Sequence, residues 1–248
     1  MAHARAGFPN EHQGATTVSP TRATLTRLLL ICCILSAVLY AAMLVFVPLQ
    51  WVGYSSAART VSELSAIGAP TRSLWRSLST LWTLLYIAFG CGLWLAAGGR
   101  RAVHWLGVTI MAAGIFGFFW PPMHLREVLA AGGKTLTDTL HIVWTVVNGL
   151  LTLLAMGLAA AAWGKSLRHL SIAIMAVLVV SGALSSMDAP GIDANLPTPW
   201  IGVWERINLG AWLLWVVVLA VTLLRASQPS FTDGASTTCA DSSQPPAC

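Results

Sequence analysis

The chain has 248 residues, of which 56% are hydrophobic and only 9% charged, and its formal net charge is +5. Soluble domains carry about 25% charged residues, so this composition excludes a soluble domain and predicts an integral membrane protein. We attribute the positive charge to anchoring at the inner leaflet and not to nucleic-acid binding.

Six apolar runs approach the roughly 20 residues that a membrane-spanning helix needs. They are residues 28–47, 78–97, 102–120, 140–163, 170–187 and 207–224. A soluble protein with six buried helices is excluded, because no polar faces remain to meet water. The sequence therefore predicts an all-α, six-helix membrane domain over residues 25–225. Residues 1–24 and 226–248 are predicted to be disordered, because they hold too few large apolar residues to offset the entropy of ordering.

The short connections between the runs predict the orientation. Residues 98–101 and 164–169 are basic, whereas residues 188–203 contain no Lys or Arg. Basic loops stay in the cytoplasm, so both termini are predicted to be cytoplasmic, in a multi-pass protein of the cell (inner or plasma) membrane. The lipid bilayer is then its first partner.

The first outer loop predicts a short amphipathic helix at the membrane surface. Ser55 or Ser56 is suited to cap this helix, and Gly68 to end it. Arg59 and Glu63 are four residues apart and predict an ion pair.

Later connections carry their own signals. The third run is predicted to stop at Trp120, because two prolines follow. A brief helix is predicted over residues 123–131, closed by Gly132. Thr198 is predicted to cap the last helix, with Pro199 at its first position.

A polar stripe marks the fourth run. Asp138, His141, Thr145, Asn148 and Thr152 are spaced three and four residues apart and fall within an arc of about 80° on one helix. Exposing these polar side chains to lipid costs free energy, so the stripe is predicted to face a bundle interior or a water-filled cavity. Its outer end is the candidate site, and its inner part, from Thr145 to Thr152, is interpreted as hydrogen bonding between helices.

The predicted topology places a set of charged residues and histidines at the same, outer end of the bundle. This constellation contains Glu63, His124, Arg126, Glu127, Asp138, His141, Asp188, Glu205 and Arg206. The predicted ligand-binding or ion-pair network is Glu63, His124, Arg126, Asp188, Glu205 and Arg206.

Specific pairs are expected within this constellation. We expect Arg206 to pair with Asp138 or Asp188, and Glu205 with Arg126, because each needs a partner if it lies partly inside the membrane. Asp138 also fits a capping box with Thr135, or orients His141 one turn further along.

A catalytic or metal site is the alternative use of these residues. Asp138 and His141, with Ser62 as a nucleophile, are candidate catalytic residues. His124, Asp138 and His141 are candidate ligands for a divalent metal such as zinc. The sequence contains no His-Glu-x-x-His pattern, nucleophile elbow or phosphate loop.

Several short motifs also resemble one family of bacterial and archaeal membrane proteins, grouped as domain of unknown function 998. The motifs are Ser62-Glu63-Leu64-Ser65-Ala66 with Gly68-Ala69-Pro70, Pro122-Met-His124-Leu-Arg126, Asp138-x-x-His141, and Glu205-Arg206. The resemblance covers about residues 25–225 and implies six helices. It also implies that these polar positions belong to one shared site or scaffold, and it implies no activity.

Three function classes follow. The first is a structural membrane protein, or one that binds a lipid or small ligand at the outer constellation. The second is a metal-dependent hydrolase that uses Asp138 and His141. The third is a small-solute or proton-coupled transporter with the stripe as its path, although the fourth run has no proline to break its helix.

Overall fold

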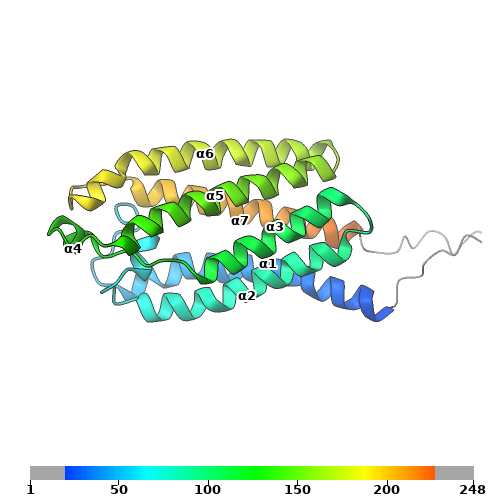
Figure 1. Ribbon diagram of the computed structural model, residues 1–248, viewed down its shortest axis with the longest axis horizontal. Coiled ribbons are helices and arrows are strands. Elements are labelled where there is room, and N and C mark those ends of the chain that lie inside the picture. The colour runs from blue at the N-terminus through cyan, green and yellow to red at the C-terminus, as the bar shows by residue number, and fades with distance from the viewer. Residues whose placement is uncertain (1–19, 227–248) are drawn as a thin grey trace, which may run out of the picture.

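The computed structural model describes residues 20–226 and consists there of helices and their connections (Figure 1). Six helices are long and apolar enough to cross a membrane, which confirms the predicted all-α six-helix class. They are α1 (Pro20–Phe46), α2 (Arg72–Ala96), α3 (Arg101–Phe118), α5 (Leu136–Ala162), α6 (Lys165–Asp193) and α7 (Ile201–Ala226). Three short helices join them: the 3₁₀ helices η1 (Pro48–Gln50) and η2 (Ser62–Ser65), and α4 (Arg126–Ala130).

The six long helices form a closed ring. The main contacts join α1 to α2, α2 to α3, α3 to α5, α5 to α6 and α6 to α7, and α7 returns to α1. Helices next to each other in the chain therefore pack side by side, and the first and last helices complete the ring (Figure 1). This arrangement gives every spanning helix one face toward a common interior.

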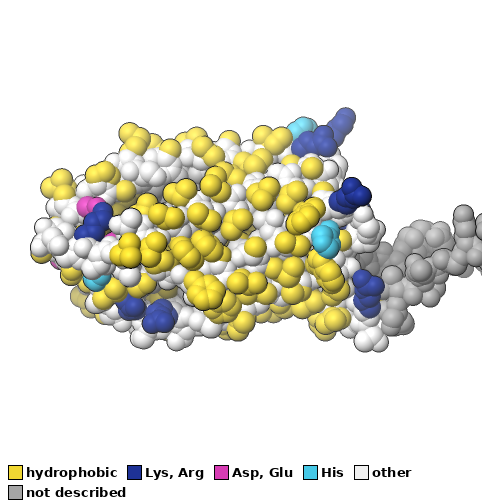
Figure 2. Space-filling view, viewed as in Figure 1, with side chains coloured by type: hydrophobic (Ala, Val, Ile, Leu, Met, Phe, Trp, Pro, Cys, Tyr) yellow, Lys and Arg dark blue, Asp and Glu magenta, His cyan; other side chains and the backbone are white. Residues whose placement is uncertain are grey.

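The two ends of the ring differ. We call the end that holds η1, η2 and α4 the loop end, and the end where α1 begins and α7 finishes the terminal end (Figure 1). Hydrophobic side chains cover the middle of the face in Figure 2, and Lys, Arg, Asp, Glu and His lie toward the two ends. This is the surface that a bilayer-spanning protein requires.

The half of the ring nearer the terminal end is tightly packed. Phe89, Leu93, Met156, Trp215 and Leu219 are all fully buried there, in one cluster contributed by helices α2, α5 and α7 and joined by residues of the other three. Apolar side chains are as well solvated by lipid as by another helix, so burying them contributes little to helix association in a membrane. Close van der Waals contact between helix backbones contributes much of it instead.

Glycine provides that approach between α2 and α3. A Cβ atom placed on Gly107 would lie 2.9 Å from the carbonyl oxygen of Gly90 and 2.7 Å from the amide nitrogen of Trp94. Gly114 is similarly tight against Ile87, whereas Gly117, one turn further along, has open space beside it. The α2–α3 contact therefore ends before the loop end is reached.

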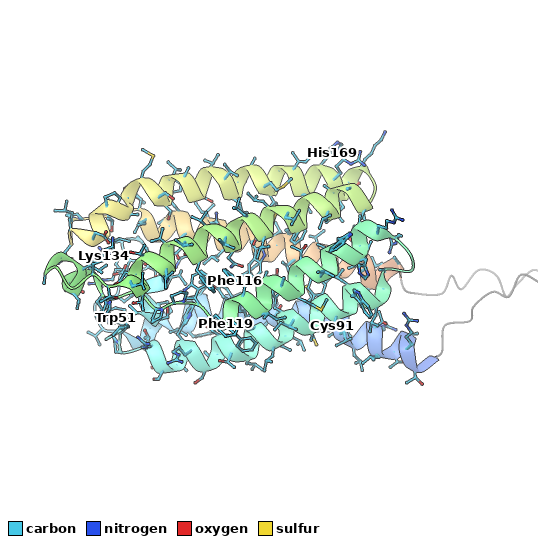
Figure 3. The ribbon with its side chains drawn as sticks, viewed as in Figure 1. Trp51, Cys91, Phe116, Phe119, Lys134 and His169 are labelled. Atoms are coloured by element: carbon cyan, nitrogen blue, oxygen red, sulfur yellow. The ribbon has the colours of Figure 1, made fainter. Side chains whose placement is uncertain are left out.

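Helix α3 is also shorter than its neighbours. Its 18 residues span about 27 Å, against about 37 Å for the 25 residues of α2. Figure 3 shows Phe116 and Phe119 partway along the bundle, well short of Lys134 at the loop end. Stacking of Phe116 on Trp144, with ring centroids 3.9 Å apart, fixes this end of α3 to α5.

The connections differ from the predictions in several places. Residues 53–70, named the first outer loop after their predicted side of the membrane, hold only the single turn η2 instead of a longer surface helix. The last outer loop is shorter than predicted, because α6 continues through Pro190 to Asp193. The brief helix is present as α4, and Gly132 follows it with φ of +81°.

The predicted disordered ends fall mostly outside the described residues. Residues 20–24 are an exception, because they form the first turns of α1, and Ala226 is the last residue of α7.

Candidate functional site

The carboxylate of Glu63 lies at the centre of a buried ionic network at the loop end. Arg126 donates two hydrogen bonds to it, from Nε to Oε1 at 2.8 Å and from Nη2 to Oε2 at 2.7 Å. Arg59 donates a third at 3.1 Å, and the backbone amide of Thr60 a fourth at 2.9 Å. Glu63 is fully buried, and a carboxylate in that position requires this degree of compensation. The predicted Arg59–Glu63 ion pair is therefore confirmed.

The network extends to both sides of this carboxylate. Arg59 also pairs with Glu127 at 2.7 Å, and Arg126 donates to the hydroxyl of Thr198 and the carbonyl oxygen of Ala58. The pKa of Arg126 is raised because the hydrogen bonds to Glu63 outweigh the opposing effect of burial. Burial raises the pKa of Glu127, but the contacts with Arg59, the backbone amide of Glu127 and the charge of Arg126 together lower it more, and the net shift is downward.

Thr198 does not play its predicted role. Its hydroxyl donates to the carbonyl oxygen of Ala58 at 2.9 Å and accepts from Arg126, so it joins the loop network instead of capping α7. The contact explains how the chain that enters α7 is fixed to the first outer loop.

The predicted pairings of Glu205 and Arg206 are wrong. Glu205 accepts from the backbone amide of Val61 at 2.5 Å and from the hydroxyl of Ser62 at 3.4 Å. Arg206 donates to the carbonyl oxygens of Ser56 (2.7 Å) and Gly202 (3.1 Å). Both charges at the start of α7 therefore hold the first outer loop through its backbone.

Tyr54 completes this attachment. Arg206 donates to its phenol oxygen at 3.1 Å, and the phenol donates to the carbonyl oxygen of Thr60 at 2.7 Å. Burial raises the pKa of Tyr54 to about 12, which keeps the phenol protonated as a donor.

The carboxylate of Asp138 links the two segments of chain that flank α4. Its carboxylate accepts from the backbone amide of His124 at 2.7 Å and from His124 Nδ1 at 2.9 Å. It also accepts from the amide and hydroxyl of Thr135, which form the predicted capping box of α5. Four donors occupy its two oxygens, so Asp138 is a structural clamp in this conformation.

His141 is not bonded to Asp138. Its Nδ1 lies 2.8 Å from the carbonyl oxygen of Pro121, and its ring packs edge-on against Trp120. Residues 20–226 contain no group of three or more His, Cys, Asp or Glu side chains suited to a metal ion. A metal held by His124, Asp138 and His141 thus remains a prediction that this arrangement does not favour.

A cavity of about 460 Å³ lies in the ring interior at the loop end, beside the ionic network. Each of the six spanning helices contributes to its lining, as does η2. The part of its lining that lies at the loop end, which we call the mouth, includes Ser62, Ser65, Arg72, Arg76 and Glu205. Its volume is within the range of about 300–1,000 Å³ that is typical of small-ligand sites.

The deep end of the cavity is aromatic. Tyr40, Trp82, Tyr86 and Trp212 pack against one another there, with Trp82 stacked on Tyr86 at a centroid distance of 5.4 Å. Within the described chain, Nε1 of Trp82 is the one buried side-chain nitrogen or oxygen that has no hydrogen-bond partner. An indole nitrogen can only donate, so this wall offers one unused donor.

The inner part of the polar stripe lines this cavity. The interpretation that it bonds neighbouring helices is wrong, because Thr145 and Thr152 donate to carbonyl oxygens of their own helix, those of His141 and Asn148. The side chains of all three stripe residues, including Asn148, border the cavity from α5. The stripe therefore faces a bundle interior, as its periodicity indicates.

The sequence-predicted residues therefore separate into two groups. Ser62 and Glu205 reach the cavity, whereas Glu63, His124, Arg126, Asp138, His141 and Arg206 fix the surrounding loops. Asp188 belongs to neither group, because its side chain has no hydrogen bond or ion pair with any described residue.

Sequence reasoning missed several cavity residues. Arg72 and Arg76 precede the second apolar run at a spacing of four, which places both on one face of α2. That spacing next to Ser79 and Thr83 is a signal that could have identified them.

The ring of spanning helices and its apolar surface define a polytopic α-helical membrane protein with a cavity in the bundle. The family described as Protein of unknown function (DUF998) matches residues 34–222, and the chain belongs to that family. No curated protein and no solved structure matches it.

Proposed function

We propose that this membrane protein binds a small amphipathic molecule, such as a lipid, in the cavity at the loop end of the ring. The observation that carries the proposal is the combination of six helical walls, a polar mouth and an aromatic deep end around one volume of about 460 Å³. The ionic network then serves to hold the loops around the mouth.

The shape of the cavity supports an elongated ligand. Its lining on α2 runs from Arg72 to Tyr86, which is a rise of about 21 Å along that helix. Polar groups occupy the start of this path, and aromatic rings occupy its end. The unused Nε1 donor of Trp82 offers a ligand oxygen a partner within the aromatic part.

The packing favours binding over transport. A solute path to the terminal end would have to cross the packed cluster, where Phe89, Leu93 and Trp215 are fully buried. The hydrolase alternative has less support, because Ser62 contacts Glu205 and not His141.

Tryptophan quenching tests the proposal, because Trp75, Trp82, Trp120 and Trp212 line the cavity. We expect a dibrominated fatty alcohol, titrated into protein in neutral detergent, to quench part of the fluorescence saturably. The Gly149→Phe variant should abolish that saturable part, since Gly149 lines the cavity and a side chain there meets open space.

The matched control is Gly157→Phe. Gly157 lies two turns further along the same helix, also has open space beside it, and does not line the cavity. The alcohol should quench the fluorescence of the Gly157→Phe variant as much as that of the unmodified protein. Equal quenching in both variants would show that the alcohol does not enter the cavity and would overturn the proposal.

A further inference from the structure

We propose, resting on the function above, that the cavity selects amphiphiles with an anionic headgroup and that Arg72 and Arg76 bind this headgroup. The inference begins with the basic side chains of the loop end. Arg59 and Arg126 pair with carboxylates, Arg206 donates to backbone carbonyl oxygens, and Lys134 pairs with Asp193.

Arg72 and Arg76 differ from these four. Neither guanidinium has a hydrogen bond or ion pair with any residue in the described part of the chain. They lie one turn apart on α2, and both line the mouth of the cavity. Two like charges at this spacing disfavour each other, so the pair is an unmatched positive site.

Glu205 lies on a different wall of the cavity from the two arginines. Its carboxylate is on the α7 wall of the cavity and is engaged by Val61 and Ser62 from the loop side. The Glu205 carboxyl is thus engaged by donors of the loop and offers no donor to an anion, whereas the two guanidinium groups on the α2 wall present planar donor forks that match a carboxylate or phosphate. Ser79, one turn beyond Arg76 on the same wall, adds a hydroxyl with no partner among the described residues.

The rest of the ligand follows from the remaining lining. Beyond the arginines, α2 contributes Trp82 and Tyr86, which together with Tyr40 and Trp212 form an apolar aromatic surface. A free inorganic anion would leave that surface empty. An anion carried on an apolar chain occupies both parts, and this is the ligand class that we infer.

Two probes that differ only in the headgroup test the inference. A dibrominated fatty acid and the fatty alcohol of the same chain are titrated separately, at a pH where the acid is ionised. In the unmodified protein we expect the acid to quench the tryptophans with an affinity about tenfold higher than the alcohol, as one charge-assisted pair contributes. In the Arg72→Gln/Arg76→Gln variant, the acid should lose that advantage, so that the ratio of the two affinities falls to about one.

The matched control removes two positive charges from the terminal end. Arg101→Gln/Lys165→Gln alters exposed residues that do not line the cavity and have no partner among the described residues. This variant should keep the preference for the acid. A preference lost equally in both double variants would reflect general attraction to a positive protein and would overturn the inference.

The outcomes separate this inference from the proposed function. If both probes quench saturably and equally in the unmodified protein, the cavity binds amphiphiles but the anionic selectivity is refuted. If neither probe gives quenching that Gly149→Phe removes, the proposed function itself fails. Inorganic phosphate alone is the third probe: if it displaces the acid at equal concentration, the arginines bind a free anion, and the inference of an amphiphile is overturned.

Discussion

Arg126 and Glu63, 63 residues apart in the chain, form a two-point ion pair in which each donor–acceptor distance is 2.8 Å or less. The pair connects α4 to η2 and so joins the connection before α5 to the connection before α2. Both side chains are buried, so removal of one partner leaves the other charge without its main compensation.

Substitution of Arg126 by Met should therefore destabilise the protein by roughly 3 kcal/mol, at the lower end of the range for broken buried pairs because Arg59 still contacts Glu63. Thermal denaturation in detergent measures the effect. Adding Glu63→Gln to Arg126→Met should restore part of the loss. The control Arg76→Met should change stability by less than about 0.5 kcal/mol, and equal losses in the two single variants would refute a special role for this pair.

Gly202 offers a test of how α7 contacts the first outer loop. A Cβ atom there would collide with the carbonyl oxygens of Ser56, Ala57 and Arg59, and the amide of Gly202 donates to the oxygen of Ala57 at 2.8 Å. Gly202→Ala should cost about 1–3 kcal/mol, as overpacking does elsewhere. Gly210→Ala, in the same helix with open space beside it, should be neutral within about 0.5 kcal/mol. Two equally tolerated substitutions would mean that the loop does not contact α7 as described.

The arrangement at Asp138 leads to an expectation for metal binding. Because its oxygens accept from His124 and Thr135, and His141 lies against Pro121, we expect added zinc or a chelator to leave the melting temperature unchanged. Metal analysis of the purified protein provides the stricter measurement. Stoichiometric zinc that is lost in His124→Ala and His141→Ala would contradict this expectation and revive the hydrolase hypothesis.

Glu127 predicts a small dependence of stability on acidic pH. Its pKa in the folded protein lies below the ordinary value of 4.5, because the contacts with Arg59, its own backbone amide and Arg126 together outweigh burial. The stability from this pair is therefore fully present above that ordinary value, and it is lost as the pH falls through the lower pKa of the folded state. The carboxylate is half exposed, so solvent screening keeps the effect small.

Melting temperatures measured between pH ~3 and ~6 test this dependence. Glu127→Gln should lower the melting temperature at the upper end of this range and have no effect at its lower end. In an Arg59→Met background the same substitution should have a smaller effect, since the ion-pair partner of Glu127 is gone. An undiminished effect in that background would assign the dependence to another group.

Much of this architecture could be predicted from the sequence. The six helices follow from hydropathy, because a bilayer admits few other solutions. The gathering of Glu63, His124, Arg126, Asp138 and Glu205 at one end follows from the number of crossings alone. The Arg59–Glu63 pair and the capping box of Thr135 and Asp138 are local, and local spacing was enough to identify them.

The partners of the remaining charges could not be predicted in the same way. Arg206 bonds backbone carbonyl oxygens of a loop that turns back over α7, and the path of that loop has no periodic signal. The polar stripe of the fourth run indicates a polar interior or cavity, but the extent and the other walls of the cavity could not be predicted, for a related reason. The cavity lies where α3 ends before its neighbours α2 and α5, and this relation between helices is not encoded in any single helix.

The contact between α1 and α7 has a consequence for biosynthesis. The chain emerges from the ribosome in order, so the ring stays open until its last spanning helix has been made. The same helix brings Glu205 to Val61 and Arg206 to Ser56, so the first outer loop waits for its bonding partners through the synthesis of some 140 residues. A chain whose translation stops before α7 therefore lacks one wall of the cavity and both of the charged side chains that hold Val61 and Ser56 in place.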